Sequence, residues 1–385
     1  MKKILKYVFI TVIILISVFC FIVPPAAENF SNTVNSKERA PSERAQQLHS
    51  TLWIADLHAD ALLWHRNLLK RSARGHVDIP RLIDGNVALQ AFTIVSKTPF
   101  GLNFERNDGS SDMITLLAMA QRWPVRSWFS LKERALYQAS RLHEFAEKSN
   151  GKFTMIKSKS DLIAYIARRE REPEITAGFL GIEGAQVLEG EIENLQLFFD
   201  TGVRMMSPSH FFDTAVGGSA HGIAKGGLTE LGKQVIRRME ELGMIVDVAH
   251  ASPKTIAEVL AIATKPIFVS HTGVKGTCDN IRNLSDAQIK GIAASGGLVG
   301  IAYFEQATCG RDVNAIVTAI KYVVELVGVE HVALGSDFDG AVETPFDTAG
   351  LIQLTDALIA AGFSDREIAL IMGENVRRVL LEVLP

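Results

Sequence analysis

Eight short apolar runs, separated by longer amphipathic stretches, constrain the fold of this chain more than any other feature of its sequence. The runs are 52–58, 87–95, 177–184, 203–210, 244–250, 266–271, 297–304 and 331–338. Most of them are continuously apolar, as parallel strands covered on both faces are. Strands that alternate with helices in this way predict a (β/α)8 barrel of the TIM type, with a long insertion after the second strand.

Helix signals between the runs support this alternation. Ser252 and Pro253 stand where an N-cap and a first helical residue are expected, and residues 229–243 and 285–296 space their apolar side chains three and four apart. The alternative is an open doubly wound sheet. Because no glycine-rich dinucleotide fingerprint follows the first run, the sequence favours the barrel.

Polar, metal-capable side chains end six of the eight runs. The stretch "DLHAD" (56–60) places Asp56, His58 and Asp60 at every second position, and alternate residues of a strand face the same side. The polar residues at the run ends are His58, Asp60, Glu183, His210, His250, His271, Asp337 and Asp339. The carboxyl ends of barrel strands open on one face, so we expect these side chains to converge there.

Three imidazoles and two carboxylates suit a divalent transition metal, most often zinc, and they are enough ligands for two ions. A carboxylate can bridge two ions that hold a hydroxide between them and polarise a substrate carbonyl. Each residue also has a structural interpretation: Asp60 can cap a helix, Glu183 can be a buried salt-bridge partner, and the aspartates of "GSDFDG" can form an Asx-turn. The recurrence at six strand ends favours the metal site.

The N-terminus differs from the rest of the chain. Lys2, Lys3 and Lys6 precede the uncharged residues 7–23, a run just long enough to cross a bilayer core about 30 Å thick. The lysines favour a cytoplasmic N-terminus and a body exported from the cytoplasm. We therefore expect residues 1–24 to be an uncleaved membrane anchor, with a cleaved signal peptide and a secreted body as the alternative.

The remainder divides into two parts. Residues 25–47 are polar and poor in large apolar side chains, which predicts a linker, and residues 48–385 show no second linker, which predicts one domain. A net charge of −3 with mixed signs argues against a nucleic-acid partner. Cys278 and Cys309 are the cysteines of the body, and an oxidising compartment would allow a disulfide between them, with two unrelated buried thiols as the alternative.

Taken in order, the motifs resemble those of the membrane dipeptidase (renal dipeptidase) family, peptidase family M19, among the amidohydrolase-like metal-dependent barrels. The matching stretches are "DLHAD" (56–60), "GIEG" (181–184), "GVRMMSPSH" (202–210), "GLTELGKQVIRRMEELGMIVDVAHAS" (227–252), "VSHTGVKGTCDNIRN" (269–283), "ALGSDFDG" (333–340) and "GENVRRVL" (373–380). The likeness extends over most of the predicted domain and keeps the family order.

The resemblance implies two zinc ions per chain, bridged by Glu183. Their further ligands would be His58 and Asp60 on one ion, and His250 and His271 on the other.

The resemblance also implies the residues that act on the substrate. His210 matches the histidine that binds near the scissile carbonyl, Arg282 the arginine that clamps the terminal carboxylate, and Asp337 the aspartate that handles the proton and recognises the amine. The catalytic residues would then be Glu183, His210 and Asp337. These roles suit the groups, because a guanidinium grips a carboxylate bidentately and a histidine donor stabilises an oxyanion.

The implied activity is hydrolysis of dipeptides by a hydroxide that bridges the two zinc ions, with a D-residue tolerated at the C-terminal position because the clamp reads only the carboxylate. An N-acyl-amino-acid or lactone hydrolase and an inactive membrane-tethered binding barrel are the alternatives. The family also implies a Cys278–Cys309 disulfide and, by analogy, a homodimer. The chain departs from the family pattern at Ala185 and Gln186, where the family has glycine and histidine.

Overall fold

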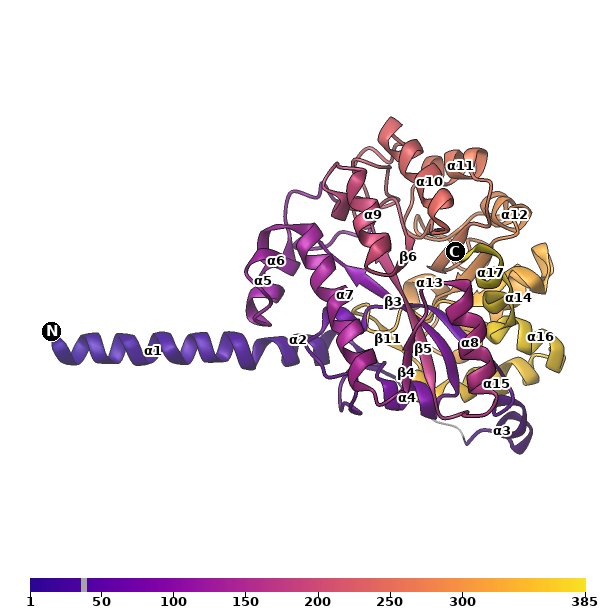
Figure 1. Cartoon of the computed structure of the whole chain (residues 1–385), viewed down its shortest axis with the longest axis horizontal. Helices are drawn as coiled ribbons and strands as arrows, with labels where there is room; N and C mark the ends of the chain where they lie inside the picture. The colour runs from indigo at the N-terminus through magenta and orange to yellow at the C-terminus, as the bar shows by residue number, and fades with distance from the viewer. Residues whose placement is uncertain (36–39) are drawn as a thin grey trace.

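The computed structural model describes residues 1–35 and 40–385, and its centre is a parallel sheet curled into a barrel (Figure 1). The barrel strands are β2 (Ile54–Ala59), β3 (Val87–Val95), β5 (Thr176–Glu183), β6 (Val203–Met206), β7 (Ile245–Val246), β8 (Phe268–Thr272), β9 (Leu298–Ile301) and β10 (Val332–Leu334). They are neighbours in the order β7-β6-β5-β3-β2-β10-β9-β8. A parallel bridge between Asp247 and Phe268 joins the two ends of this order. The predicted (β/α)8 barrel is confirmed, and the open sheet is wrong.

Each predicted run overlaps one barrel strand, although β2 and β8 end one residue beyond their runs and most strands are shorter than their runs. β3 has the predicted bounds, whereas β6 ends at Met206 and leaves His210 in the following loop. Pro208 lies between them and has no N–H to donate to a sheet. Short strands outside the barrel order are β4 (Phe153–Met155), which pairs with the start of β5, and β1 (Thr33–Val34), which pairs with β11 (Glu343–Thr344).

Helices surround the barrel, as expected for this fold. They are α1 (Lys2–Phe21), α2 (Val23–Ser31), α3 (Glu43–His49), α4 (Ile79–Asp84), α5 (Met113–Ala120), α6 (Arg126–Phe129), α7 (Leu131–Lys148), α8 (Lys159–Arg169), α9 (Glu193–Asp200), α10 (Glu230–Leu242), α11 (Pro253–Ile262), α12 (Asp286–Ala294), α13 (Glu305–Thr308), α14 (Val313–Val327), α15 (Ile352–Ala360), α16 (Asp365–Ala369) and α17 (Asn375–Val383). Helical turns of other types are η1 (Ala61–Leu63), η2 (Ala185–Leu188), η3 (Val329–His331), η4 (Thr348–Gly350) and η5 (Leu370–Glu374). Ser252 is the predicted N-cap of α11, and its hydroxyl accepts the N–H of Thr255.

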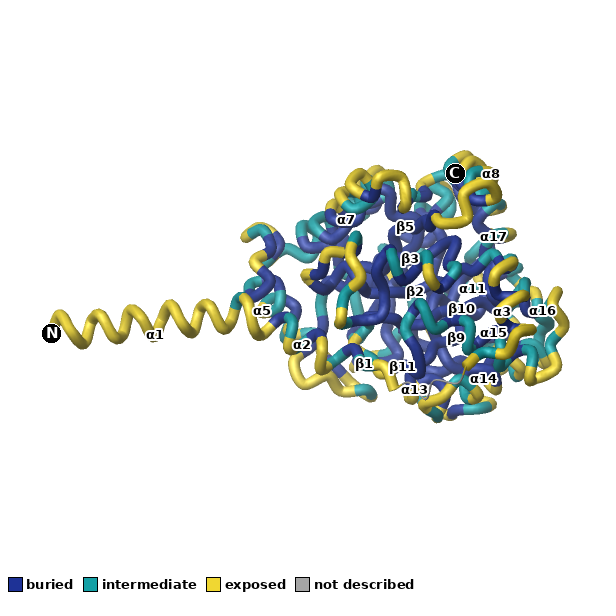
Figure 2. Tube along the Cα trace, turned by 90° about the horizontal axis from the view of Figure 1, so that it is seen from below, coloured by how far each residue is buried: buried dark blue, intermediate teal, exposed yellow. Residues whose placement is uncertain are grey.

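The core has two layers. One buried cluster joins alternate strand residues, such as Leu89 and Ala91 of β3, to side chains of α8 and α17. A larger cluster lies between the outside of the sheet and the surrounding helices. Figure 2 shows the strands buried in the centre of the molecule, with exposed residues on the helices around them. This arrangement leaves the strand ends free for polar residues.

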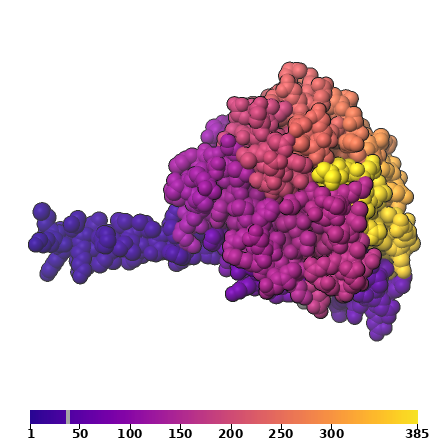
Figure 3. Space-filling model, viewed as in Figure 1, coloured from indigo at the N-terminus to yellow at the C-terminus, as the bar shows by residue number. Residues whose placement is uncertain are grey.

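The N-terminal helix stands apart from this core. α1 projects from the domain as a rod, without a buried residue of its own (Figures 2 and 3). The helix over residues 2–31 has a mean hydropathy of 2.8 in its most apolar window, and it is long and apolar enough to cross a membrane. An apolar surface of this size is compatible with the anchor predicted for residues 1–24.

Residues 25–47, which we expected to be a linker, contain helices and a short strand in the part that the structure describes. Residues 23–35, which we name the strap, form α2 and β1 and pack against the barrel; residues 36–39, also within the expected linker, lie outside the described residues. Within the strap, Glu28 is buried and pairs with Arg66 and Arg74. The polar composition that suggested a solvated linker instead provides buried ion pairs and hydrogen bonds.

Candidate metal centre

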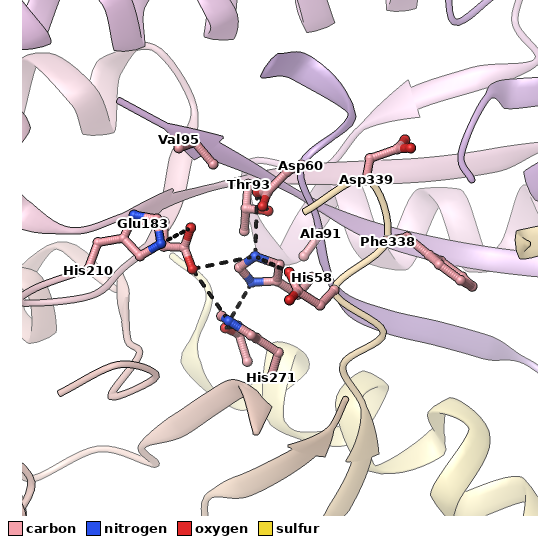
Figure 4. A network of polar contacts seen from close by, with 12 residues as sticks. His58, Asp60, Ala91, Thr93, Val95, Glu183, His210, His271, Phe338 and Asp339 are labelled. Atoms are coloured by element: carbon pink, nitrogen blue, oxygen red, sulfur yellow. Dashed lines mark hydrogen bonds and ion pairs between the residues drawn. The ribbon is translucent and has the colours of Figure 1, made fainter. Parts of the chain in front are cut away.

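Seven of the predicted site residues meet in one buried cluster at the carboxyl ends of the barrel strands. They are His58, Asp60, Glu183, His210, His250, His271 and Asp337, which we name the metal cluster. A cavity of about 310 Å³ opens on this cluster, and Arg282 also lines it. Figure 4 shows the side chains of Glu183, His210, His271 and His58 turned toward one another from separate strands and loops.

Glu183 stands at the centre of the cluster. Its Oε1 lies 2.9 Å from Nε2 of His250, 3.4 Å from Nε2 of His271 and 3.7 Å from Nε2 of His58. Its Oε2 lies 3.1 Å from Nε2 of His210. One carboxylate at the end of β5 therefore faces four imidazoles.

Ser270 orients two of these rings. Its hydroxyl donates to Oδ2 of Asp247 at 2.7 Å, while Nδ1 of His58 and Nδ1 of His271 lie 3.1 and 3.0 Å from the same oxygen. Since the hydroxyl has a single hydrogen, it accepts from both rings, and each Nδ1 carries the proton. Each Nε2 atom is then directed at the cluster, and it offers the lone pair that a metal ligand needs when the ring is neutral.

The backbone also shapes the site. His250 and Asp337 have φ angles of 60° and 61°, in the left-handed region that non-glycine residues rarely adopt. Such conformations persist where the surrounding structure determines them, and they are frequent at functional sites. Asp60 is held differently, because the Thr93 hydroxyl on the neighbouring strand donates to its Oδ1 at 2.6 Å.

Burial and charge act in opposite directions on the imidazoles. Burial lowers the pKa of His58, but the carboxylates of Asp60 and Glu183, with that of Asp337, outweigh it and raise the pKa to about 10. Burial, with repulsion from neighbouring cationic groups, holds the pKa values of His250 and His271 well below the usual range. The cluster thus attracts positive charge while keeping most of its ring nitrogens available as ligands.

The carboxyl groups show the complementary effect. Burial and the nearby Asp60 raise the pKa of Glu183 well above its usual value, although His58 opposes this. Burial raises the pKa of Asp337 to about 7, again against the attraction of His58. Buried carboxyl groups this close together repel one another as anions, and a bound cation relieves that repulsion.

The residues of the cluster fit zinc. His58 is fully buried, and its Nε2 has no hydrogen-bond partner among the described residues, although three carboxylates surround it. Imidazole nitrogens and carboxylate oxygens are donors that bind zinc in proteins. Three overlapping groups of potential ligands lie in the cluster: His58, Glu183 and His271; Glu183, His210 and His250; and His58, Asp60 and Asp337. His58 and Glu183 each belong to two of these groups.

Two aspartates of the sequence motifs lie outside the metal cluster. Asp56 accepts bonds from Gln90 and Ser336, because a register shift between Asp56 and Ala59 interrupts the regular alternation of β2. Asp339 points away from the metal cluster (Figure 4) and pairs with Arg66.

Asp339 belongs to a second group of charged residues, of which all but the partly exposed Arg74 are buried. This group consists of Glu28, Arg66, Arg74, His76 and Asp339, and we name it the arginine cluster. Arg66 joins the carboxylates of Glu28 and Asp339 directly, and the backbone N–H of His76 donates to Asp339 at 2.7 Å. The arginine cluster ties the strap to the strand ends of β2 and β10.

Arg282 reaches the cavity from the loop after β8. Its Nη2 donates to the carbonyl oxygen of His271 at 2.7 Å, and its side chain is buried. A disulfide between Cys278 and Cys309 joins this loop to the end of α13. Asn283 also joins this loop to α13, because its side-chain amide donates to the carbonyl oxygens of Cys278 and Ala307.

Sequence reasoning missed three residues that contribute to the site. Asp247 and Ser270 orient the rings, and the signal for them was their position in "VDVAH" and "VSH", close before predicted ligands. His221 lines the cavity, with Nδ1 bonded to the carbonyl oxygen of Phe104 and its ring 5.2 Å from that of His250. No pattern in the sequence distinguished it. Gln186, at the departure from the family motif, donates to Ser96 and to the carbonyl oxygen of Glu183.

Comparison with known proteins bears on this site. The model for membrane dipeptidases (peptidase family M19) matches residues 42–384. An uncharacterized Klebsiella pneumoniae protein from the pqqA 5′ region is 33% identical over 261 residues, which are 64% of this chain and 94% of that protein. An uncharacterized dipeptidase of Schizosaccharomyces pombe is 26% identical over 360 residues, which are 88% of this chain and 83% of that protein.

Solved structures share the fold. The probable dipeptidase PvdM of Pseudomonas aeruginosa matches with a TM-score of 0.74 at 21% identity, over 89% of this chain and 98% of that one. A metallo peptidase of Rhodobacter sphaeroides, liganded with a phosphinate mimic of the dipeptide L-Ala-D-Ala, matches with a TM-score of 0.71 at 24% identity, over 87% of this chain and all of that one.

Proposed function

Since the chain belongs to the membrane dipeptidase family, peptidase family M19, we propose that it is a zinc-dependent dipeptidase of the membrane dipeptidase type. One observation carries the proposal: Glu183 faces the Nε2 atoms of His58, His250 and His271 at 2.9–3.7 Å, in a cavity that Arg282 also lines. The proposed metal ligands and a cation that can bind a carboxylate would thus meet at one cavity of about 310 Å³.

The metal cluster would hold two zinc ions. His58, Asp60 and Glu183 are the proposed ligands of one ion, and Glu183, His250 and His271 those of the other. When bound, the ions would supply a hydroxide nucleophile at neutral pH and would polarise the scissile carbonyl. Ser270 and Asp247 support this assignment, because they direct the Nε2 lone pairs of His58 and His271 toward the site.

The remaining polar groups would position the dipeptide and move the proton. Arg282 binds the terminal carboxylate, and His210, whose pKa burial holds well below the usual range, stays neutral and donates its N–H to the developing oxyanion. Asp337, with a pKa of about 7, takes up the proton of the attacking water and passes it to the leaving amine.

We further propose that a D-residue is accepted at the C-terminal position. Arg282 would contact the carboxylate, which both enantiomers carry, and not the side chain. The similar metallo peptidase of Rhodobacter sphaeroides was solved with a mimic of L-Ala-D-Ala, which supports this specificity.

The proposal includes the placement of the enzyme. Residues 1–24 would anchor the chain, residues 48–385 would form the catalytic domain outside the cytoplasm, and a homodimer is proposed by analogy with the family. The exposed, apolar α1 supports the anchor. Proteolysis of intact and of opened cells would distinguish the side of the membrane, and light scattering in detergent would measure the oligomeric state.

Removal and restoration of zinc test the activity. The full-length protein, purified in detergent and freed of metal by a chelator, is expected to lose cleavage of a panel of dipeptides and to recover it with about two equivalents of zinc. The panel includes D-residues at the second position. No recovery over the whole panel would contradict the proposal, and the failure to bind any zinc would favour the inactive binding barrel.

An N-acyl-amino-acid or lactone hydrolase is the second candidate, because apolar side chains of Leu102, Met113, Ile114 and Leu117 line one wall of the cavity and would suit an acyl chain. Substitution Arg282→Met separates the two. Loss of dipeptide turnover with retained zinc is expected for a dipeptidase that clamps the carboxylate. Unchanged turnover of a lactone without a carboxylate, together with no dipeptide cleavage by the unsubstituted protein, would favour the second candidate.

A further inference from the structure

An exposed apolar surface lies on the insertion between β3 and α7, over residues 112–130. We name it the α5–α6 face. Its exposed apolar side chains are Met113, Leu116, Val125 and Phe129, with exposed fractions of 44%, 48%, 65% and 79%. Their opposite side is packed, since Ile114 and Trp123 lie in a small buried cluster of their own. Large apolar side chains gathered in this way mark an interaction surface.

The α5–α6 face lies at the base of the membrane helix. Arg122, which follows α5, donates to the carbonyl oxygen of Cys20 at 2.5 Å, and its guanidinium lies 4.3 Å from the ring centre of Phe21. Figures 1 and 2 show α5 beside the end of α1 from two directions. The face therefore meets α1 at the point where the apolar helix ends.

The strap fixes the direction of α1 relative to the barrel. Glu28 of α2 is held by Arg66 and Arg74, and Asn32 accepts the backbone N–H of Ala341 at 2.8 Å. Pairing of β1 with β11 follows directly. Because α1 runs into this anchored strap after a single intervening residue, the domain is held close to the plane from which α1 emerges.

The composition of the face suits a lipid surface. Between residues 112 and 130, the basic residues are Arg122 and Arg126, and the single acidic residue is Asp112. Asp112 pairs with Arg134 at 2.8 Å and Arg126 pairs with Glu133 at 2.9 Å, so neither leaves an unbalanced charge on the face. Trp128 adds an amphipathic ring. Apolar, aromatic and arginine side chains together are typical of surfaces that rest in the lipid headgroup region.

We propose that the α5–α6 face rests on the lipid bilayer that α1 crosses, so that the catalytic domain lies against the membrane. This goes beyond the dipeptidase activity, although it rests on the proposed anchor. α5 then has two sides: Met113 lies at the boundary between the face and the cavity, while Ile114 and Leu117 line the cavity itself. The entrance of the site is consequently held beside the lipid headgroups.

Depth measurements on the full-length chain in lipid nanodiscs test the proposal. A fluorophore is attached at position 129 through Phe129→Cys in a Cys20→Ser background, and the matched control carries it through Ile163→Cys on α8, where the apolar side chain is 53% exposed. Cys20→Ser keeps the carbonyl that Arg122 contacts. Nitroxide-labelled lipids are expected to quench the label at 129 and to leave the label at 163 bright.

Equal emission from the two labels in the presence of the lipid quencher would overturn the proposal. A label at 129 that is shielded from both the lipid nitroxide and an aqueous quencher would also overturn it, in favour of a second copy or another protein on this face. Dipeptide turnover is measured on the same nanodiscs. Quenching does not depend on turnover, so failure of the docking surface and failure of the proposed activity are distinguishable.

A charge substitution gives a second measurement. Phe129→Glu with Val125→Glu leaves buried residues untouched and is expected to increase the separation of the domain from the membrane, read as reduced energy transfer from a dye on the domain to a dye in the lipid. Ile163→Glu is the control and should leave the transfer unchanged. Unchanged transfer in the double variant would contradict the proposal.

Discussion

The metal cluster and the arginine cluster are both buried, both rich in carboxylates, and only two residues apart in the chain at Asp337 and Asp339. They differ in where the balancing positive charge comes from. In the arginine cluster Arg66 supplies it: burial lowers its pKa, but Asp339 and Glu28 outweigh burial and keep the guanidinium charged. In the metal cluster the basic groups are imidazoles, and burial lowers the pKa values of three of them, His210, His250 and His271, while the surrounding carboxylates raise that of His58.

A group of buried carboxylates therefore does not by itself indicate a metal site. What matters is whether the chain provides its own permanent cation. A guanidinium cannot release its proton in a protein, whereas an imidazole readily does. Carboxylates paired with imidazoles are left with unbalanced charge, and an external cation completes them. Four substitutions or conditions test this distinction, in order of decreasing effect.

The largest effect is expected for Glu183→Gln. An amide cannot bridge two cations as a carboxylate does, so zinc content should fall and dipeptide turnover should decrease at least about 1,000-fold, since metal catalysis supplies several kcal/mol and each 1.4 kcal/mol is tenfold. Zinc analysis and turnover measure it. Asp339→Asn is the control in the other cluster and should retain zinc. Equal loss of zinc in the two variants would contradict the proposal that only the metal cluster binds zinc.

Arg66→Met should act on stability and not on metal. Removing one partner of a buried ion pair leaves uncompensated charge and costs about 3–5 kcal/mol. We expect the free energy of unfolding, measured by urea denaturation in detergent, to fall by that amount with zinc content unchanged. Adding Glu28→Gln removes one of the buried carboxylates that the substitution leaves without a cation, and it should recover part of the loss. A double variant less stable than the single one would contradict the charge-balance explanation.

Ser270→Ala should weaken the metal site without removing a ligand. Loss of the hydroxyl frees the Nδ1 atoms of His58 and His271, and such orienting partners are worth about 10- to 100-fold in metal affinity. Ser336→Ala is the matched control, since Ser336 also donates to a buried aspartate, Asp56, at 2.7 Å. It should leave zinc affinity within about threefold of the unsubstituted protein, while lowering stability by about 1 kcal/mol. Equal zinc affinity in the two variants would argue against the orienting role.

The smallest effect is expected at His49, which belongs to neither cluster. Burial lowers its pKa from 6.5 to about 4, although the bond to Gly85 opposes this. The unfolded chain therefore binds this proton at a higher pH than the folded chain does. The contribution to stability is complete above pH 6.5 and is lost as the pH falls toward 4, by about 2 kcal/mol between pH 7 and 5.

Unfolding curves at several pH values measure this effect, with His49→Gln as the comparison. The glutamine amide can replace the donor to Gly85 but cannot take up the proton, so its stability should change less between pH 7 and 5. The measurement at His49 complements the comparison of the two clusters, because it gives the effect of a buried imidazole without neighbouring carboxylates on the pH dependence of the free energy of unfolding. An identical pH dependence of both proteins would contradict the assignment to His49.

The fold was largely predictable because its signals are local. Apolar runs and helix caps, such as Ser252, arise from neighbouring residues, and β3 was predicted to the residue. The strand ends were less predictable. Asp337 and Asp339 share a face if the strand continues, but both have φ angles in the left-handed region, at 61° and 64°, so the alternation rule does not apply to them.

The candidate site was predictable as a set of residues and not as a network. Ligand-type residues stand out at strand ends, whereas the roles of Ser270 and Asp247 depend on the spacing of adjacent strands, which no pattern encodes. The expected linker shows the same limit. Glu28 is charged and was assigned to solvent, yet its partner Arg66 lies far along the chain and becomes visible only in three dimensions.

The pairing of the strap with β11 has a consequence for biosynthesis. Asn35 and Glu343, which bond to each other beside this pairing, are 308 positions apart in the chain. During translation α1 is synthesised first and β11 near the end of the chain. The domain can therefore change its orientation relative to α1 while it folds. Only after β11 has been synthesised can it pair with β1 and fix the orientation of the domain relative to α1. A polypeptide that terminates before β11 would keep α1 but would lack this fixed orientation.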